Sequence, residues 1–397
     1  MRTSVPATAD VVVVGAGVQG ASLAFHLAKR GVRVAVVERS AIAAGATGRS
    51  SGFVRMHYDL AVESALAWAS FPYFTSWGEH VGAGDPGFVQ TGFLQLADVH
   101  DAAALRANVH AQVALGIRTG VVSPAEIAQL VPGIVLDGIV CGAYEPLSGY
   151  ADPSGTAAGF IAAAVHLGAT LSAGVRATAI RTAGGCVTGL ATDAGDIAAP
   201  VVVVAAGAWS AVLAATAGVA VPVEPWRHDT AYFGLPPTHP SSIPVVLDRP
   251  GAVYFRPEGR DLLLVGLETH NVLGGSPDLP VDVGDPGFVE VAVERLCRRV
   301  PWMTLGDVRT SHGGQDGITP DQRAILGPVG VAGPDGLWLA CGFSGTGFKT
   351  APAIGASMAE WILDGRPITV DITPFSFARV VEGRRLDGEH PYGPLWS

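Results

Sequence analysis

The feature that most constrains the fold is the segment VVVVGAGVQGASLAFHLAKRGVRVAVVER, residues 11–39. Val11 to Val14 form a continuous β-branched run, which is typical of a strand buried on both faces. Apolar residues then recur with helical spacing up to Lys29, where a Lys-Arg-Gly sequence predicts the end of a helix. A second predicted strand, Val32 to Val37, ends at Glu38. The segment therefore predicts a complete βαβ unit.

The turn inside this unit, residues 15–20, matches the dinucleotide fingerprint G-x-G-x-x-G. Gly15 permits the tight turn, Gly17 lets backbone amides approach a pyrophosphate, and Gly20 allows the helix to pack closely on the strands. Glu38 is placed to accept hydrogen bonds from a ribose hydroxyl pair and would repel the extra phosphate of NADP. The pattern therefore predicts that the chain binds NAD or FAD.

Composition favours a globular protein that binds a small molecule. Of 397 residues, 49% are hydrophobic and 15% are charged, with a net charge of −10. The acidic balance, without any basic run, disfavours nucleic acid and anionic membranes as partners. We expect a cytoplasmic protein, since no signal peptide and no apolar stretch of membrane-spanning length is visible. The four cysteines lie far apart, which indicates neither a zinc site nor a disulfide framework.

The rest of the chain predicts two interleaved structural units. Residues 170–206 read as short strands broken by turns, and the buried run at their end suggests a return to the first sheet. Residues 91–145 and 219–319 carry more proline, aromatic residues and alternating strands, with a helix predicted at Val289 to Arg299. These two stretches indicate a separate, mostly antiparallel layer.

Several motifs together resemble the flavin-dependent amine oxidoreductases of the D-amino-acid oxidase superfamily, most closely the sarcosine oxidase and dimethylglycine dehydrogenase branch. The resemblance spans nearly the whole chain. Besides the first βαβ unit, it rests on four segments: AGATGRSSGFVRMHY at 44–58, VVVVAAGAWS at 201–210, SHGGQDGITPDQRAILG at 311–327 and GFSGTGFK at 342–349. The last of these nearly matches a P-loop, but Phe348 interrupts the spacing that a phosphate-binding loop needs.

The resemblance implies an α/β fold in which a Rossmann-like FAD-binding domain of the glutathione-reductase type is interleaved with an antiparallel-sheet substrate domain. The FAD-binding domain would comprise residues 1–90, 145–218 and 320–370, the substrate domain 91–144 and 219–319, and a tail 371–397. Together with the fingerprint, the resemblance predicts these cofactor contacts: Gly15, Gly17, Val18, Gln19, Gly20, Glu38, Arg39, Thr47, Gly48, Arg49, Ser50, Ser51, Val175, Ala206, Gly207, Trp209, Gly342, Ser344, Gly345, Thr346, Gly347, Phe348 and Lys349.

The activity implied by the resemblance is oxidation of a secondary or tertiary amine that carries a carboxylate, by hydride transfer to flavin N5. Arg55 and Lys349 would hold the carboxylate, while Tyr254 and His270 would lie on the substrate side of the flavin. Two alternatives stay open: a flavin-dependent 2-hydroxy acid oxidoreductase, and a flavin-binding subunit of a hetero-oligomeric dehydrogenase.

Departures from the family pattern limit what the resemblance implies. His312 and Asp316 stand where the family has tryptophan and tyrosine, and an acid at 316 could attract a second, cationic group on the substrate. Gly314 and Arg49 stand where some relatives attach the flavin covalently, which predicts non-covalent FAD. Leu264 lies near the position of a lysine with which some relatives activate oxygen, so the electron acceptor, oxygen or another, stays open.

Overall fold

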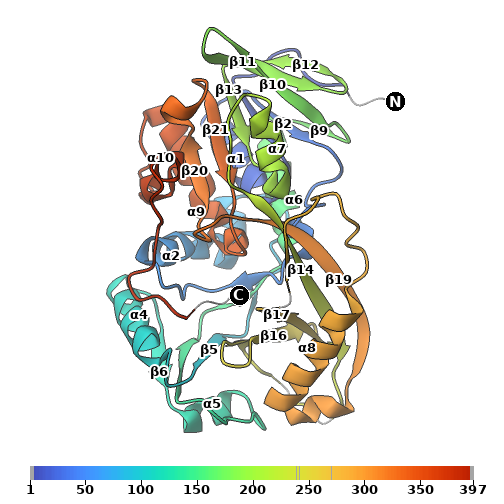
Figure 1. The fold of residues 1–397 in the computed structure, drawn as a ribbon, viewed down its shortest axis with the longest axis vertical. Coiled ribbons are helices and arrows are strands. Elements are labelled where there is room, and N and C mark those ends of the chain that lie inside the picture. Colours follow the sequence, from blue (N-terminus) through green and yellow to red (C-terminus); the bar gives the residue numbers. More distant parts are fainter. Residues whose placement is uncertain (1–3, 238, 241, 270, 394–397) are drawn as a thin grey trace.

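The computed structural model describes residues 4–237, 239–240, 242–269 and 271–393. Two large sheets dominate the molecule. Figure 1 shows a six-stranded sheet with its helices in the upper half and a nine-stranded sheet in the lower half. His270, which the sequence suggested as a site residue, lies outside the described residues.

The six-stranded sheet has the order β20-β21-β13-β1-β2-β9, and only the edge strand β20 is antiparallel to its neighbour. Its strands are β1 (Val11–Val14), β2 (Val34–Glu38), β9 (Thr170–Ala173), β13 (Val201–Val204), β20 (Ile325–Pro328) and β21 (Leu337–Cys341). Because β1 is central, its valines are buried on both sides: Val11 and Val13 belong to one core cluster, Val12 and Val14 to another.

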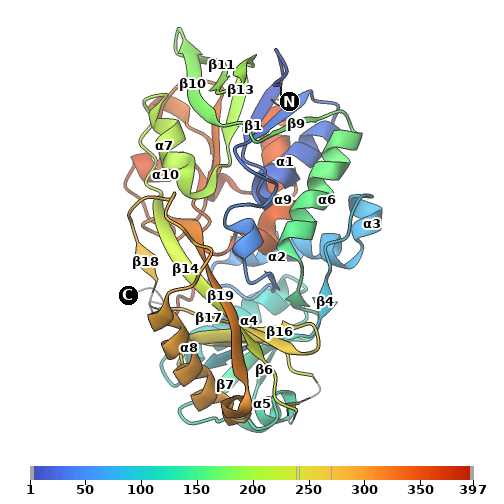
Figure 2. The same cartoon turned by 90° about the vertical axis from the view of Figure 1, so that its right-hand side faces the viewer.

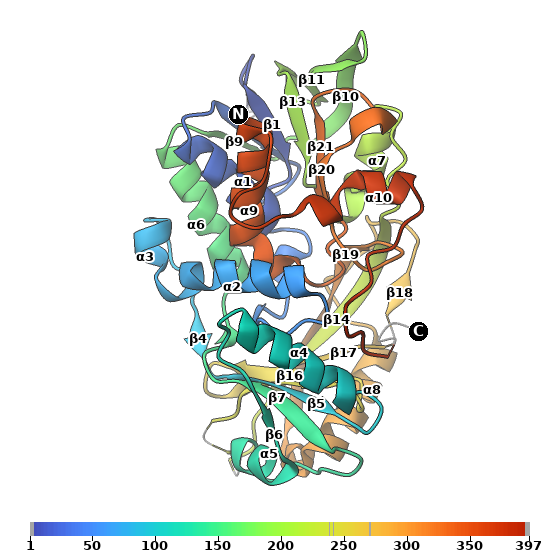
Figure 3. The same cartoon turned by 90° about the vertical axis from the view of Figure 1, so that its left-hand side faces the viewer.

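Helices cover one face of this sheet and a small sheet covers the other, as the two side views show (Figures 2 and 3). The helices are α1 (Val18–Lys29), α6 (Pro153–His166) and α9 (Gly347–Asp364). The opposite layer consists of β10 (Ala177–Ala183), β11 (Cys186–Thr192), β12 (Gly195–Ala198), α7 (Ser210–Ala215) and α10 (Phe377–Val381). α9 packs so closely on α1 that a Cβ at Gly355 would lie 2.2 Å from Ser22 Oγ.

The nine-stranded sheet has the order β18-β14-β17-β16-β15-β5-β7-β6, with β19 also paired to β14. Its strands are β5 (Phe93–Ala97), β6 (Gly120–Val122), β7 (Cys141–Glu145), β14 (Glu224–Gly234), β15 (Val245–Asp248), β16 (Val253–Glu258), β17 (Leu262–Leu267), β18 (Val272–Leu273) and β19 (Asp307–Ile318). The long strands β14 and β19 reach from this layer towards the upper one (Figure 1). One face buries apolar side chains against α8 (Pro286–Arg299), including Phe255 and Leu296.

Shorter elements join these layers. A third small sheet has the order β3-β8-β4, with bounds Phe53–Val54, Gly149–Tyr150 and Val89–Gln90. The other helices are α2 (Ala61–Thr75), α3 (Trp77–His80), α4 (Ala102–Ala114) and α5 (Pro124–Leu130). Short 3-10 helices occur at Thr47–Arg49, Gly207–Trp209, Pro301–Leu305, Gly330–Ala332 and Thr373–Phe375. None of the helices in the described residues is long and apolar enough to cross a membrane.

The predicted elements are present with shifted ends. The second strand begins at Val34 instead of Val32, because the N–H of Val32 bonds to Leu27 O and still belongs to the turn that ends α1. α8 begins at Pro286, three residues before its predicted start, because the carboxylate of Asp285 caps it by accepting from the N–H of Phe288 at 3.1 Å. The domain boundaries and the cytoplasmic location stay predictions.

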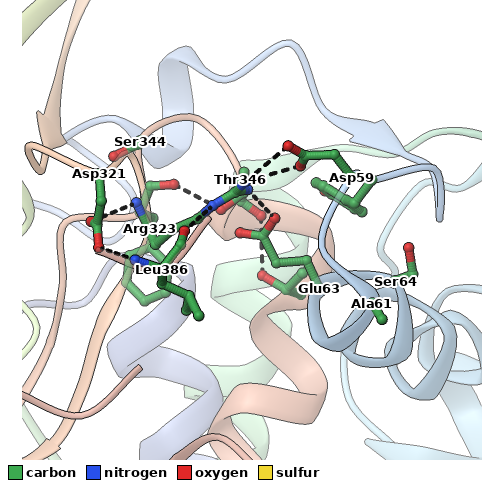
Figure 4. A network of polar contacts seen from close by, with 12 residues as sticks. Asp59, Ala61, Glu63, Ser64, Asp321, Arg323, Ser344, Thr346 and Leu386 are labelled. Carbon is green, nitrogen blue, oxygen red and sulfur yellow. Dashed lines mark hydrogen bonds and ion pairs between the residues drawn. The ribbon is translucent and has the colours of Figure 1, made fainter. Parts of the chain in front are cut away.

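The segment 384–393, which we call the strap, is fixed to the sheets by a buried ion pair. Asp321 accepts hydrogen bonds from Arg379 Nε at 2.9 Å and Arg379 Nη2 at 3.2 Å, and from the N–H of Leu386 in the strap at 3.2 Å. Arg379 is 1% exposed. Figure 4 shows Asp321 and Leu386 joined in this way.

A second cation extends the same network to α2. Arg323 donates to Glu63 Oε2 at 2.6 Å and to both carboxylate oxygens of Asp59 at 3.0 Å, and its Nε also bonds to Leu386 O at 3.3 Å (Figure 4). Burial raises the pKa of Glu63 to about 7, and the charge of Arg323 opposes this shift. The network therefore links α2, the strand ends and the strap.

Replacing Arg379 by methionine should lower the free energy of unfolding by about 3–5 kcal/mol, because it leaves the buried Asp321 carboxylate without its ion-pair partner. Urea denaturation followed by circular dichroism measures the change. Arg384, whose pairing with Glu382 is exposed, is the control, and Arg384→Met should cost less than about 1 kcal/mol. Equal losses for the two variants would contradict the role of the network.

Candidate functional site

A cavity of about 970 Å³ lies between the two large sheets. Gly17, from the start of α1, and Gly345, from the start of α9, both line it, although they come from opposite parts of the sequence. Tyr254, on β16 of the nine-stranded sheet, also lines it. This volume lies at the upper end of the range for ligand sites, about 300–1,000 Å³. The cavity is therefore large enough for a sizeable cofactor together with a small substrate.

The turn from β1 to α1 presents bare backbone to this cavity. Gly15 has a φ of 110°, and a Cβ there would lie 2.4 Å from the carbonyl oxygen of Ala205. Gly20 packs the helix against the turn, since its Cβ would lie 2.0 Å from Gly15 O. Gln19 Oε1 is buried beside them without a hydrogen-bond partner among the described residues. Together with the N-terminus of α1, this cradle fits the diphosphate of a dinucleotide.

Glu38 fixes the neighbouring loop. Its carboxylate accepts from the N–H groups of Ala16 at 2.9 Å and Ser40 at 2.8 Å. Thr47 closes the same region by accepting from the N–H of Val18 at 3.0 Å. Each oxygen of Glu38 retains a second lone pair, so its predicted contact with a ribose stays open to it.

A polar latch spans the outer part of the cavity. Arg39 lies 3.9 Å above the ring of Trp209, and both side chains donate to Asp278 Oδ1, at 2.7 and 2.9 Å. Asp278 belongs to the loop between β18 and α8, which Arg227 anchors by donating to Pro280 O and Val283 O. The latch thus joins the loop to the nucleotide-binding side of the cavity.

The turn before α9 has an unusual backbone at the cavity wall. Ser344 has a φ of 50°, a conformation that few residues other than glycine adopt. Its hydroxyl donates to Gly342 O at 3.2 Å and accepts from the N–H of Thr319 at 3.3 Å, which holds the turn in place. Asp316 accepts from the N–H of Gly345 at 2.9 Å.

Two cations predicted to hold a carboxylate line the cavity. Lys349 lies in the first turn of α9 and not in a loop, and its Nζ donates to Gly345 O at 3.3 Å. Burial lowers the pKa of Lys349 to about 7, and the charge of Arg55 adds to this, whereas Glu63 and Asp316 oppose it. Arg55 lies 4.3 Å above the ring of Tyr58 and donates to a backbone carbonyl, and it makes no ion pair within the described residues.

Tyr254 forms a hydrogen-bonded pair with a histidine that the sequence analysis missed. The hydroxyl of Tyr254 lies 2.5 Å from His228 Nε2, and His228 Nδ1 lies 2.8 Å from Asn271 Oδ1. Because the amide oxygen can only accept, Nδ1 carries the proton and Nε2 accepts from the tyrosine. Burial lowers the pKa of His228 to about 4, so the ring is neutral at neutral pH. Gly266 leaves the room that the Tyr254 ring occupies.

Most predicted cofactor contacts line the cavity, and four do not. Gly20 serves helix packing, and Val175 is buried in the core next to β2. A Cβ at Gly48 would meet Ala43 O at 2.5 Å, and one at Gly342 would meet Thr319 Cγ2 at 2.4 Å, so both serve close backbone packing. All other predicted site residues within the described part of the chain do line the cavity. They are Gly15, Gly17, Val18, Gln19, Glu38, Arg39, Thr47, Arg49, Ser50, Ser51, Ala206, Gly207, Trp209, Ser344, Gly345, Thr346, Gly347, Phe348, Lys349, Arg55 and Tyr254.

The two departures at 312 and 316 lie in different surroundings. His312 is not among the residues that line the cavity; it contacts Thr230 Oγ1 at 3.2 Å. Asp316 lines the cavity, and its two oxygens accept from the N–H groups of Gly317 and Gly345. The expected attraction of Asp316 for a second, cationic group stays a prediction. Opposite Asp316 on β14, Trp226 lines the cavity and supplies an aromatic wall.

Several cavity residues carried no recognisable sequence signal. Tyr392 of the strap lines the cavity, and its hydroxyl lies 2.5 Å from His57 Nε2. His57 is fully buried and also bonds Gln112 at 2.8 Å. The hydrogen bond between Tyr392 and His57 joins residues 335 positions apart. Only the alternation of side chains along β14, which puts Trp226 and His228 on one face, could have indicated part of this set.

Comparison with known proteins identifies the family of this arrangement. A model of the family described as FAD dependent oxidoreductase matches residues 10–361. The chain is similar to mitochondrial sarcosine dehydrogenase of Mus musculus, with 30% identity over 390 residues that cover 91% of this chain and 40% of that protein. It is also similar to FAD-dependent oxidoreductase domain-containing protein 1 of Bos taurus, with 29% identity covering 97% of this chain and 87% of that protein. The chain thus spans less than half of the dehydrogenase.

A solved structure shares the fold. The crystal structure of L-proline dehydrogenase from P. horikoshii superimposes with a TM-score of 0.88, covers 96% of this chain and 100% of its own, and has 24% sequence identity. This likeness confirms the predicted fold class.

Replacing Asp278 by alanine should speed the release of FAD by about fivefold, because the latch loses an exposed ion pair and a hydrogen bond, together worth about 1 kcal/mol. The return of flavin fluorescence after dilution measures the rate. Asp282→Ala on the same loop is the control, since that side chain is 88% exposed and lies 3.4 Å from Arg49. A release rate that Asp278→Ala leaves unchanged would show that the latch does not retain the cofactor.

Proposed function

Because the chain belongs to this family of FAD dependent oxidoreductases, we propose that it oxidises the C–N bond of a secondary or tertiary amine that carries a carboxylate. An N-methyl or cyclic amino acid is the substrate class that fits best. The observation that carries the proposal is the pair of cations, Arg55 and Lys349, in the same cavity as the glycine-rich dinucleotide cradle. The bound FAD supplies the acceptor for the hydride.

Arg55 and Lys349 would position the substrate by its carboxylate. Within the described residues neither side chain has an ion-pair partner. Lys349 is buried and Arg55 is partly buried, so an anion would provide the missing counter-charge. Holding this end of the substrate fixes the distance of the reacting carbon from the flavin ring, which is the main task left to the protein.

The pair of Tyr254 and His228 would orient the substrate amine. The amine must lose its proton before it can release a hydride. Because burial lowers the pKa of His228 to about 4, its ring is too weak a base to take that proton at neutral pH, so the amine would bind in its neutral form. Since His228 Nε2 accepts from the Tyr254 hydroxyl, the tyrosine oxygen can in turn accept a hydrogen bond from the N–H of a secondary amine. This assigns an orienting role to Tyr254 in place of a purely structural one.

No single residue of the described site identifies the molecule that accepts the electrons from the reduced flavin. Leu264, where some relatives are expected to carry a lysine, is buried in an apolar cluster with Phe93 and Tyr254. Oxygen and another acceptor therefore both stay candidates, and oxygen consumption during turnover distinguishes them. The sequence analysis also left a 2-hydroxy acid oxidoreductase and a flavin-binding subunit as alternatives.

An anaerobic panel tests the proposed function directly. The purified protein is mixed with N-methylated, cyclic and D-amino acids and with 2-hydroxy acids, and the loss of flavin absorbance is followed. We expect bleaching by a secondary or tertiary amino acid. Bleaching by 2-hydroxy acids alone would support the first alternative, and bleaching only in the presence of a partner chain would support the second.

Replacing Lys349 by methionine should weaken carboxylate binding by about tenfold to a hundredfold, because one charge-assisted hydrogen bond contributes about 1.5–3 kcal/mol. FAD binding should change far less. With a pKa of about 7, Lys349 is charged below that pH, so the native protein should bind a carboxylate more tightly at pH 6 than at pH 8. Titration with methoxyacetate, followed by the flavin spectrum, measures both effects.

The control for this substitution is Lys29→Met, which removes an exposed lysine at the end of α1. It should leave the titration unchanged. If the step near pH 7 persists in Lys349→Met, another group holds the carboxylate.

A further inference from the structure

The nine-stranded sheet presents a row of side chains to the cavity. In the register of the strands, Gln95 on β5 stands beside Leu247 on β15, Leu247 beside Tyr254 on β16, and Tyr254 beside Gly266 on β17. Glu268 comes two residues after Gly266, so it belongs to the same face. All of these except Gly266, which has no side chain, line the cavity. The row is the floor on which a substrate would lie.

Two polar side chains of this floor each have an atom without a hydrogen-bond partner in the part of the chain that the structure describes. Glu268 is 3% exposed and Gln95 is 2% exposed. Neither Glu268 Oε2 nor Gln95 Nε2 makes a hydrogen bond among the described residues. Burying such atoms without partners costs free energy, so they are rarely retained unless something binds to them. The proposed contacts of the substrate carboxylate, with Arg55 and Lys349, leave both unexplained.

The charges of two arginines act on the unpartnered carboxyl. The charges of Arg249 and Arg55 both act on Glu268, with Asp248 and Asp101 opposing them. Burial raises the pKa of Glu268 to about 8 despite the two guanidinium groups, so at neutral pH it keeps its proton and can donate a hydrogen bond.

Arg249, which lines the same cavity as Glu268, is held by several contacts. Its Nε donates to Asp101 at 2.9 Å, and its Nη2 donates to Gly393 O at 2.7 Å. The ring of Tyr392 lies against its guanidinium, 4.6 Å from Cζ to the ring centroid. The strap therefore packs against Arg249 and helps to hold its guanidinium group in place.

We propose that Glu268 and Arg249, with Tyr392 packed against the arginine, form a second substrate subsite that accepts an oxygen acceptor, above all a second carboxylate. The inference rests on the proposed function and narrows its substrate class to amines that carry an anionic or carbonyl oxygen beyond the first carboxylate. A cationic group fits less well, because Arg249 and Arg55 would repel it. An aliphatic group would leave Glu268 and Gln95 unpartnered.

The test compares three ether ligands on the FAD-bound protein at pH 7. Methoxyacetate carries one carboxylate, oxydiacetate adds a second, and (2-aminoethoxy)acetate adds an ammonium group instead. The ether oxygen takes the place of the reacting nitrogen in each ligand. The primary amine of (2-aminoethoxy)acetate lies beyond that position, and the absence of flavin bleaching under anaerobic conditions establishes that it is not oxidised. The change in the flavin spectrum reports binding. Oxydiacetate should bind about tenfold to a hundredfold more tightly than methoxyacetate, the gain of one charge-assisted hydrogen bond.

Two variants assign this gain to the carboxyl group. Glu268→Leu should abolish the advantage of oxydiacetate and leave methoxyacetate binding unchanged. Glu268→Gln should retain the advantage, because the amide N–H can donate in place of the acid proton. Glu294→Leu, which removes an exposed carboxylate on α8, is the matched control and should bind all three ligands like the native protein.

The ligand comparison on the native protein decides the question even if Glu268→Leu does not fold. Equal affinity for methoxyacetate and oxydiacetate would overturn the second subsite and leave the proposed function intact. Tighter binding of (2-aminoethoxy)acetate than of oxydiacetate would also overturn it, in favour of a cationic group. If no ligand perturbs the flavin, the subsite and the proposed carboxylate anchor fail together.

Discussion

One hydrogen bond unites the two halves of the site: Gln19 Nε2 donates to the carbonyl oxygen of Gly347 at 2.6 Å, across 328 positions of the sequence. It ties the first turn of α1 to the first turn of α9, so that both helices begin at the same cavity. The close approach of Gly355 to Ser22 makes this alignment possible, because any larger residue would separate the two helices. The rest of the site depends on it, since the glycine cradle and the cationic side of the cavity would otherwise lie apart.

Acids that are already occupied by other partners partly offset the cost of burying the charge of Lys349. Glu63 and Asp316 both favour the charged form of Lys349, yet Glu63 is bonded to Arg323 and Asp316 to two backbone amides. The charged form of Lys349 is therefore stabilised by the electrostatic effect of nearby carboxylates, without an ion-pair contact to either of them. A site of this kind is prepared for an anion without being neutralised in advance, which is what substrate binding requires.

Local pattern sufficed to predict the first βαβ unit and the glycines of its turn, because their requirements lie within a few neighbouring residues. The resemblance added Arg55, Tyr254 and Lys349, all of which line the cavity. The partner of Tyr254 could not be predicted in this way, since His228 meets it only through the pairing of strands that are distant in sequence. The same holds for Tyr392, whose position depends on the path of the strap across helices and strands.

The strap has a mechanical consequence for how ligands reach the cavity. It bonds to Asp321 beside the upper sheet at one end and to Arg249 beside the lower sheet at the other, and so it spans both layers like a tie. A hinge-like rotation of one layer away from the other would have to break these contacts together. Substrate exchange should instead proceed through small, local openings while the two layers stay fixed relative to each other. The rate of exchange would then be limited by the size of the cavity entrance and not by a large domain motion.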